Sequence, residues 1–462
     1  MKTYQDWLEV ADKGDKERMD FVFSAITDYK NSNLYKYALT AQSYYDGKNE
    51  VIEKARKIIY NSLGQAVPDL VSANHKIADN FFKRDVVQAT STLLSNGCTW
   101  ASKTAEGGKA LGKSFDRRLC KLHRWSQIAG ISWAFFNKDH IDTFKATEFF
   151  GLEDEEDGMV KLGIRFWQID DTKPLRAVLY ELDGYTGFIR RIDKAPEIYS
   201  PKRAYILKVN TTEADGDEID SGINYPAFPV VPLYANEQHQ SELIGLKNTI
   251  DAIDLIQSGY CNDTDEMNFL YWTIVGNGGM DDADLIEVLD KLRKLHAANL
   301  NNNQELQPHT VDMPYLSREA ILDRLEKKLY KDAMAMDTYN LASGSVTATQ
   351  IIASYEPLRQ KLDLQEDEVS DFIARLLTVA GVEDEATYKR SLIINKGEEI
   401  DNYLKGAEYL DDIYITESIM TILGDKDQIK TVLERKAVED QNRMTNGGGN
   451  LNNNEGDDDT QI

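Results

Sequence analysis

Between residues 243 and 271, one stripe of side chains repeats at alternating spacings of three and four residues. This spacing places its members on one face of an α-helix. They are Leu243, Leu246, Ile250, Ile253, Gln257, Tyr260, Thr264, Met267 and Tyr271. We therefore predict a helix over residues 241–272, about 45 to 50 Å long at roughly 1.5 Å per residue. Because Gln257 and Thr264 interrupt the apolar stripe, we expect this helix to pack against neighbouring subunits as well as its own core.

Helical and strand patterns are segregated along the rest of the chain. Residues 1–100 mix charged and apolar side chains at helical spacing, whereas residues from about 148 to 236 form short apolar runs between turns such as DGYTG. The segment YPAFPVVPLY closes this strand-rich region, since its three prolines exclude a helix interior and a central strand. Such segregation is typical of an α+β fold rather than of alternating βαβ units.

A protruding tip and a second helix are predicted after the long helix. Gly276, Gly278 and Gly279 end the long helix, and a short helix with an extended segment follows them. The next helix begins near Ser317, a good N-cap residue, and runs to about Tyr339.

A third long helix carries a proline in its interior. Thr347 and Gln350 form a capping box that opens a helix ending at Gly381. Pro357 removes one backbone donor and crowds the preceding turn, so we predict a kink there. The alternative is two separate helices with a break at Glu356. Further helical segments follow, and the tail of residues 441–462 is predicted to be disordered because it lacks apolar periodicity.

The stretch GGKALGKS, residues 107–114, matches the phosphate-loop pattern G-x-x-x-x-G-K-[ST]. A true phosphate loop joins a buried strand to a helix. Here the preceding CTWASKTAE is too polar for a central parallel strand. The simpler interpretation is a flexible loop before the helix KSFDRRLCKLHRWSQIAG. The alternative is a P-loop ATPase that uses Lys113 and Ser114.

Other catalytic and metal-binding signatures are missing from the sequence. It contains no H-E-x-x-H and no G-x-S-x-G, and three widely spaced cysteines form no C-x-x-C pair. Its six histidines are dispersed, at His75, His123, His140, His239, His296 and His309. The acidic run EDEEDG, residues 153–158, is interpreted as a solvated loop, with a divalent-ion site as the alternative. We expect no catalytic residue, no cofactor and no metal.

The formal net charge is −25, from 53 basic and 78 acidic side chains. Such a chain repels nucleic acid on average, so tight or sequence-specific DNA binding is not expected. No apolar stretch is long enough to span a bilayer and no secretory signal opens the chain, so we expect no membrane contact and folding in a cytosol.

The order of these elements resembles the portal proteins of tailed bacteriophages, specifically the siphophage-type portal family. SYYDGKNEV is similar to the family's early Tyr-Tyr-x-Gly segment, and IAGISWAFF to its Gly-centred strand. FPVVPLYANEQHQSELIGLKNTIDAIDLIQSGYCND resembles its proline-rich strand followed by the first stem helix. LASGSVTATQI and YITESIMTILGDKDQIKTVLERKAVED resemble its Ser-Gly loop and its C-terminal helices. The resemblance covers residues from about 40 to 440.

The resemblance implies an α+β portal fold with wing, stem, clip and crown. The implied parts are an N-terminal helical part of the wing (1–100), a strand-rich wing (101–240), a first stem helix (241–272), a clip (273–315), a second stem helix (316–340), a tunnel loop (341–347), a kinked wing helix (348–381), a C-terminal helical crown (382–440) and a disordered acidic tail (441–462). The residues implied at the channel constriction are Asn340, Leu341, Ala342, Ser343, Gly344, Ser345 and Val346.

The resemblance also implies a non-enzymatic ring of twelve copies through which double-stranded DNA passes without sequence preference. The implied partners are the terminase large subunit, a head-completion adaptor and the major capsid or scaffolding protein, at the portal vertex of a virion assembled in the host cytoplasm. Arg324, Lys328 and Lys331, beside Lys327, are either a solvated helix face or contacts to the DNA backbone. The alternative functions are the P-loop ATPase and another ring-forming head or connector protein.

Overall fold

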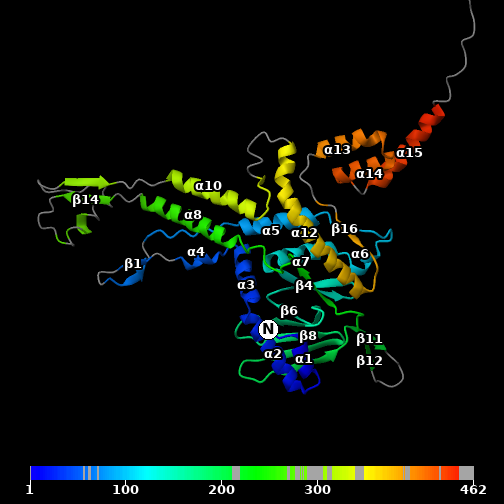
Figure 1. Cartoon of the computed structure of the whole chain (residues 1–462), viewed down its shortest axis with the longest axis horizontal. Helices are drawn as coiled ribbons and strands as arrows, with labels where there is room; N and C mark the ends of the chain where they lie inside the picture. Colours follow the sequence, from blue (N-terminus) through cyan, green and yellow to red (C-terminus); the bar gives the residue numbers. More distant parts are fainter. Residues whose placement is uncertain are drawn as a thin grey trace, which may run out of the picture. The chain divides into compact units, whose positions relative to one another are not determined.

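The computed structural model describes residues 2–55, 58–60, 64–69, 72–210, 219–267, 271–275, 281, 284, 286–288, 305–309, 315–338, 348–388, 390, 396–425 and 428–446. The chain divides into two compact units (Figure 1). The first unit comprises Met1–Ser343 and Ala353–Ser391, and the second comprises Gly344–Ile352 and Leu392–Ile462.

A five-stranded antiparallel sheet and two N-terminal helices form one core of the first unit. The sheet has the order β10-β9-β8-β7-β6. Aromatic and aliphatic side chains of α1 and α2, including Trp7 and Tyr29, pack on sheet residues such as Phe150 and Phe188. The elements are α1 (Tyr4–Ala11), α2 (Asp15–Asn31), β6 (Phe149–Glu153), β7 (Val160–Trp167), β8 (Leu175–Glu181), β9 (Gly184–Arg190) and β10 (Glu197–Arg203).

A three-stranded sheet of order β13-β4-β5 lies beside helix α7. The proline-rich strand β13 is an edge strand, as predicted, and Pro232 pairs with Trp133 there. An edge position tolerates a proline because one side of the strand needs no ladder donors. The elements are α7 (Phe115–Ala129), β4 (Ile131–Asn137), β5 (His140–Lys145) and β13 (Val230–Tyr234).

Helices α3, α5, α8 and α10 of the first unit meet in a separate apolar cluster that contains Phe81, Phe82, Ile250 and Leu329. The other helices are α3 (Asn33–Tyr45), α4 (Glu50–Lys54), α5 (Phe81–Leu94), α6 (Glu106–Leu111), α8 (Lys247–Met267), α10 (Tyr315–Asp332) and α12 (Ala348–Ala380), which belongs to the first unit from Ala353 onwards. Four two-stranded sheets complete the described strands: β1 (Ile58–Tyr60) with β2 (Ala66–Pro68), β3 (Cys98–Trp100) with β16 (Ala386–Tyr388), β11 (Ile206–Asn210) with β12 (Ile219–Ile223), and β14 (Tyr271–Val275) with β15 (Glu305–His309).

The second unit is helical. It contains α13 (Lys396–Lys405), the 3₁₀ turn η1 (Gly406–Glu408), α14 (Asp412–Leu423) and α15 (Ile429–Asn446). Helix α14 packs against both α13 and α15, and Lys436 of α15 forms an ion pair with Asp412 at 3.0 Å.

Both predicted stem helices are shorter than the sequence pattern indicated. Residues 241–246 form turns, with Gly245 in the left-handed region (φ +87°), so the first helix begins at Lys247. Tyr271 begins strand β14 because the run YWTIV is rich in aromatic and β-branched residues. The second helix ends at Asp332, and Met334 adopts a left-handed φ of 53° two residues later.

The third long helix is confirmed as α12, which is continuous through Pro357. The alternative of two helices broken at Glu356 is therefore wrong, whereas the kink stays a prediction. Two boundaries near the C-terminus also differ. Residues 386–388 pair as β16 with β3 and so belong to the first unit, not to a helical crown. Residues 441–446 continue α15, since no helix breaker precedes Gly447. The rest of the predicted tail lies outside the described residues.

Candidate functional site

Helices α8 and α10 form an antiparallel pair, seen side by side in Figure 1. Ile250 and Ile253, from the first turns of α8, share an apolar cluster with Leu329 from the last turns of α10. Strand β14 follows α8 in the chain and pairs with β15, which precedes α10. The two helices therefore lead from a common apolar base to a common β-hairpin.

Beyond this base, α8 binds an extended segment, residues 72–80, through polar side chains. Alternate backbone N–H groups of the segment donate to side-chain oxygens that lie one helical turn apart. The bonds run from Asp79 to Asp254 at 2.7 Å, from Ile77 to Ser258 at 3.0 Å and from His75 to Asn262 at 2.6 Å. The spacing of the donors matches that of the acceptors, because two residues of an extended chain span about 6.6 Å and four residues of a helix span about 6 Å. One face of α8 thus accepts the backbone hydrogen bonds of an extended segment that belongs to none of the described sheets.

This polar ladder adds a packed face that the sequence pattern did not predict for the first stem helix. The sequence pattern placed Gln257, Tyr260 and Thr264 on the packed side, but Thr264 is exposed. The buried positions beyond Ile253 are instead polar, at Asp254, Ser258 and Asn262. Apolar periodicity misses this face because backbone donors, not apolar side chains, lie against it. The detectable signal is the spacing of four residues between these short polar side chains.

Asp254 is the titratable member of the ladder, and its pKa is shifted. It has no exposed surface, and burial raises its pKa to about 6, with a smaller contribution from the neighbouring carboxylates Asp79 and Asp251. Nδ2 of Asn49 donates to its second oxygen at 2.5 Å and partly opposes this rise. Oδ1 of Asn49 is buried and has no partner in the described part of the chain.

The basic residues predicted to contact DNA lie on the exposed side of α10. Lys327 is paired with Asp323 at 2.5 Å, and Lys328 is paired with Asp332 one turn away. Among the described residues, neither Arg324 nor Lys331 has a carboxylate partner within ion-pair distance. The charges of Lys327 and Lys328 are therefore neutralised within α10, whereas those of Arg324 and Lys331 are available to an external anion.

A buried ion cluster joins α12 to the ends of both helices of the pair. The ammonium of Lys361 lies 3.0 Å from Asp85 of α5 and 3.2 Å from Glu242, in the turn before α8. It also donates to the carbonyl of Ala333, just after α10, at 3.2 Å. Burial alone would lower the pKa of Lys361, but the two carboxylates raise it above its ordinary value, so the side chain stays charged.

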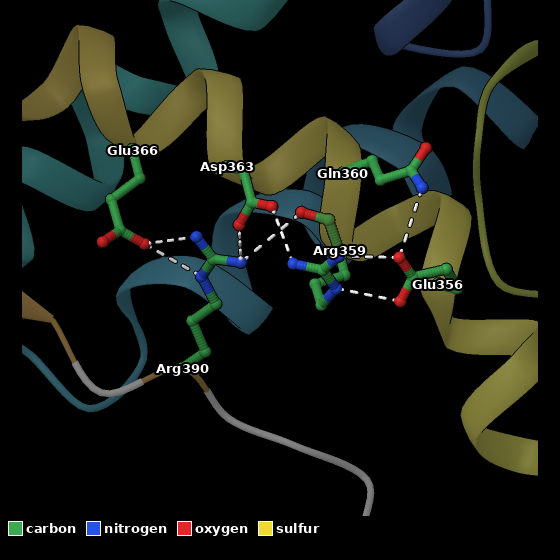
Figure 2. A network of polar contacts seen from close by, with 6 residues as sticks. All are labelled: Glu356, Arg359, Gln360, Asp363, Glu366 and Arg390. Carbon is green, nitrogen blue, oxygen red and sulfur yellow. Dashed lines mark hydrogen bonds and ion pairs between the residues drawn. The ribbon is translucent and has the colours of Figure 1, made fainter.

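A network of polar contacts lies on α12 between Glu356 and Glu366 and includes Arg390 (Figure 2). Arg359 binds Glu356 at 2.7 Å and Asp363 at 2.9 Å within the helix. Arg390, which follows β16, binds Asp363 at 2.6 Å and Glu366 at 2.5 Å. A single exposed ion pair typically contributes little to stability. In this network, however, Arg359 and Arg390 share Asp363, and Arg390 attaches the segment after β16 to α12.

The GGKALGKS stretch does not form a phosphate loop. Gly107 and Gly108 lie inside the short helix α6, so the flexible-loop interpretation is also wrong. They are glycines because the ring of Trp100 lies against them, and a Cβ at Gly107 would come within 2.4 Å of it. The preceding strand β3 pairs antiparallel with β16 in a two-stranded sheet. A phosphate loop requires a buried parallel strand instead.

A carboxylate of the protein itself occupies the start of α6. Asp384 accepts hydrogen bonds from the N–H groups of Gly107 at 2.9 Å and Ser102 at 3.0 Å, and from the Ser102 hydroxyl at 2.8 Å. These bonds, led by that of Gly107, lower the pKa of Asp384 to about 2. An internal anion therefore lies where the sequence pattern suggested a phosphate.

The other predicted sites were placed as follows. The tunnel-loop residues Asn340 to Val346 lie outside the described residues. In the acidic EDEEDG run, Asp154 is paired with Lys161 and accepts a hydrogen bond from Gln5.

Among the described residues, no three His, Cys, Asp or Glu side chains are arranged to hold a metal ion. The described helices also include none with the length and hydrophobicity to cross a membrane.

Comparison with known proteins places most of the chain in one family. The family model for phage portal proteins of the SPP1 Gp6-like type matches residues 25–445. A portal protein of Clostridium phage phiCD119 is 22% identical over 439 residues, covering 87% of this chain and 93% of that protein. The portal protein of Bacillus phage SPP1 is 22% identical over 392 residues, covering 79% and 76%.

Two solved structures are also similar. A chain from the neck of an empty GTA particle, computed with C6 symmetry, is 11% identical with a TM-score of 0.42, covering 75% of this chain and 90% of that chain. An HK97 family phage portal protein from Corynebacterium diphtheriae is 9% identical with a TM-score of 0.32, covering 66% and 91%.

Removing the buried ammonium is expected to destabilise the first unit strongly. Lys361→Met leaves the carboxylate of Asp85 buried without its cation, which typically costs about 3–5 kcal/mol of unfolding free energy. The double variant Lys361→Met with Asp85→Asn should lose less, because no buried charge remains at position 85. Urea denaturation measures both values. A Lys361→Met protein as stable as wild type would contradict the structural role of the cluster.

Asp254 should contribute a pH-dependent difference between wild type and Asp254→Asn. Its folded pKa of about 6 exceeds the unfolded value of about 3.9, so wild type loses stability as pH rises between these values. The variant lacks this loss, so its stability relative to wild type should increase from about pH 4 to about pH 6 and then stay constant. Urea denaturation of both proteins at several pH values tests this. A difference that does not change with pH would mean that Asp254 titrates normally.

Proposed function

This chain belongs to the SPP1 Gp6-like family of phage portal proteins, and from that premise we propose that it forms the ring through which double-stranded DNA enters and leaves the capsid. The observation that carries the proposal is the family match over residues 25–445. We propose a ring of twelve copies at the portal vertex of the virion, assembled in the host cytoplasm. It would dock the terminase large subunit during packaging, then a head-completion adaptor, and contact the major capsid or scaffolding protein.

In this proposal the structural elements take the following roles. Helices α8 and α10 are the stem, and the β14–β15 hairpin belongs to the clip that meets the terminase and the adaptor. Residues 341–347 are the tunnel loop and α12 is the wing helix behind it. The two larger sheets with α1 to α7 form the wing, and α13 to α15 form the crown. The antiparallel α8–α10 pair with a hairpin at its end supports the assignment of stem and clip.

Electrostatics supports a channel that DNA can slide through. Twelve copies with a charge of −25 each carry about −300 formal charges, so a wall of like sign keeps phosphates from adhering. Lys327 and Lys328 add little attraction, because each is offset by an aspartate one turn away. Arg324 and Lys331 would supply a limited, sequence-independent contact to the DNA backbone.

The proposal predicts unequal effects for two neighbouring lysines. Lys331→Ala should lower the yield of packaged DNA several-fold, because it removes a charge that is available to phosphate. Lys328→Ala, the matched control on the same helix, should have a smaller effect, because Asp332 already offsets that charge. Nuclease-protected DNA in proheads assembled with each variant measures the difference. Packaging by Lys331→Ala at the wild-type level would remove this residue from the DNA path.

A further inference from the structure

Helix α7 carries a concentrated basic face on a strongly acidic chain. Arg117, Lys121 and Arg124 follow one another at spacings of four and three residues, which places them on one side of the helix. With Arg118 and with Arg165 of β7 they line a hollow against β5, whose other lining residues are Asp142, Thr143 and Phe144. Asp142 is the only carboxylate among these lining residues, so the hollow has an excess of positive charge.

Most of this charge has no carboxylate partner in the described part of the chain. Arg118 is held by Asp142 at 3.2 Å, and the guanidinium of Arg165 stacks over the ring of Phe144 at 4.4 Å. Lys121 lies 4.3 Å from the centre of the Trp125 ring. Among the described residues, Arg117, Lys121 and Arg124 have no carboxylate within ion-pair distance.

A complementary acidic face lies on α12. Asp367 and Asp371 are exposed and one turn apart, whereas Glu368 is half-buried and lies nearer the side of α12 that carries Gln365. None of the three forms an ion pair with a described residue. Burial and the nearby Asp371 raise the pKa of Glu368. Arg375 partly opposes this rise but is not paired with Glu368.

The two faces cannot neutralise each other within one copy. Gln365 of α12 is buried and donates to Gln127 of α7 at 2.7 Å, so this side of α12 faces α7. Asp367 and Asp371 lie on the opposite side of α12, because they are two and six residues from Gln365 in a helix of about 3.6 residues per turn. The acidic face therefore points away from α7.

We propose that the basic face of α7 in one subunit docks onto the acidic face of α12 in the next copy of this chain. The inference rests on the proposed ring and identifies one of its contacts. An interface that pairs identical patches would bring the arginines of two copies together and repel. A head-to-tail interface pairs unlike patches instead, and it forms a ring where the rotation between copies closes. Nucleic acid is the less favoured occupant, because a chain of charge −25 repels it overall.

Charge reversal tests this contact in the full-length protein. In Arg117→Glu with Lys121→Glu, the basic face becomes acidic and would repel α12 of the neighbouring copy. The matched control is Lys173→Glu with Lys194→Glu, which changes the net charge equally at exposed loop positions outside both faces. The compensating variant adds Asp367→Lys and Asp371→Lys to the α7 reversal. Light scattering after size exclusion and negative-stain images measure assembly, and thermal unfolding verifies that each variant is folded.

The expected result is that wild type and the control form rings, the α7 reversal stays largely monomeric, and the compensating variant recovers rings. Rings formed equally by the folded α7 reversal would overturn this inference and leave the proposed ring intact. If those rings then package less DNA, the basic face contacts nucleic acid instead. A wild-type protein that forms no ring would contradict both the proposed function and this contact.

Discussion

One buried ammonium group holds together the ends of α8 and α10, helix α5 and helix α12. Lys361 binds Asp85, Glu242 and the carbonyl of Ala333, so α5, the turn before α8, the end of α10 and α12 meet at a single charge. An unpaired charge at this depth is costly, so these elements hold their positions together. The proposed tunnel loop, residues 341–347, is flanked by two of them. Its flanks are therefore connected to both proposed stem helices through one ion cluster.

Away from this cluster, helix α8 of the proposed stem is held by polar contacts as well as by apolar packing. The ladder from Asp254 to Asn262 binds backbone donors of residues 72–80, and only the base of α8 lies in an apolar core. Such a helix is supported on one side by its own chain and retains exposed apolar side chains, such as Leu255, on another. This distribution suits a helix whose remaining surface is covered by neighbouring copies in a ring.

The sequence predicted the elements better than their ends. Segregated periodicities identified the strand-rich region, α7, α10 and a continuous α12, because these have apolar faces against a local core. The face of α8 was missed because its partners beyond Ile253 are backbone N–H groups, which leave no apolar pattern. The GGKALGKS stretch was ambiguous because its partner, Asp384, lies 277 residues from Gly107 in the chain. The pairing of Lys361 with Asp85 across 276 residues could not be predicted from spacing either.

The central claim is that α8 and α10 surround a channel in a closed ring of identical chains. Electron cryomicroscopy of the purified full-length protein tests this claim most directly. The account predicts a ring with a central hole wide enough for duplex DNA, with α8 and α10 around the hole and the exposed side of α10 carrying Lys331 towards it. Single subunits, or rings with α8 and α10 on the outer rim, would contradict it.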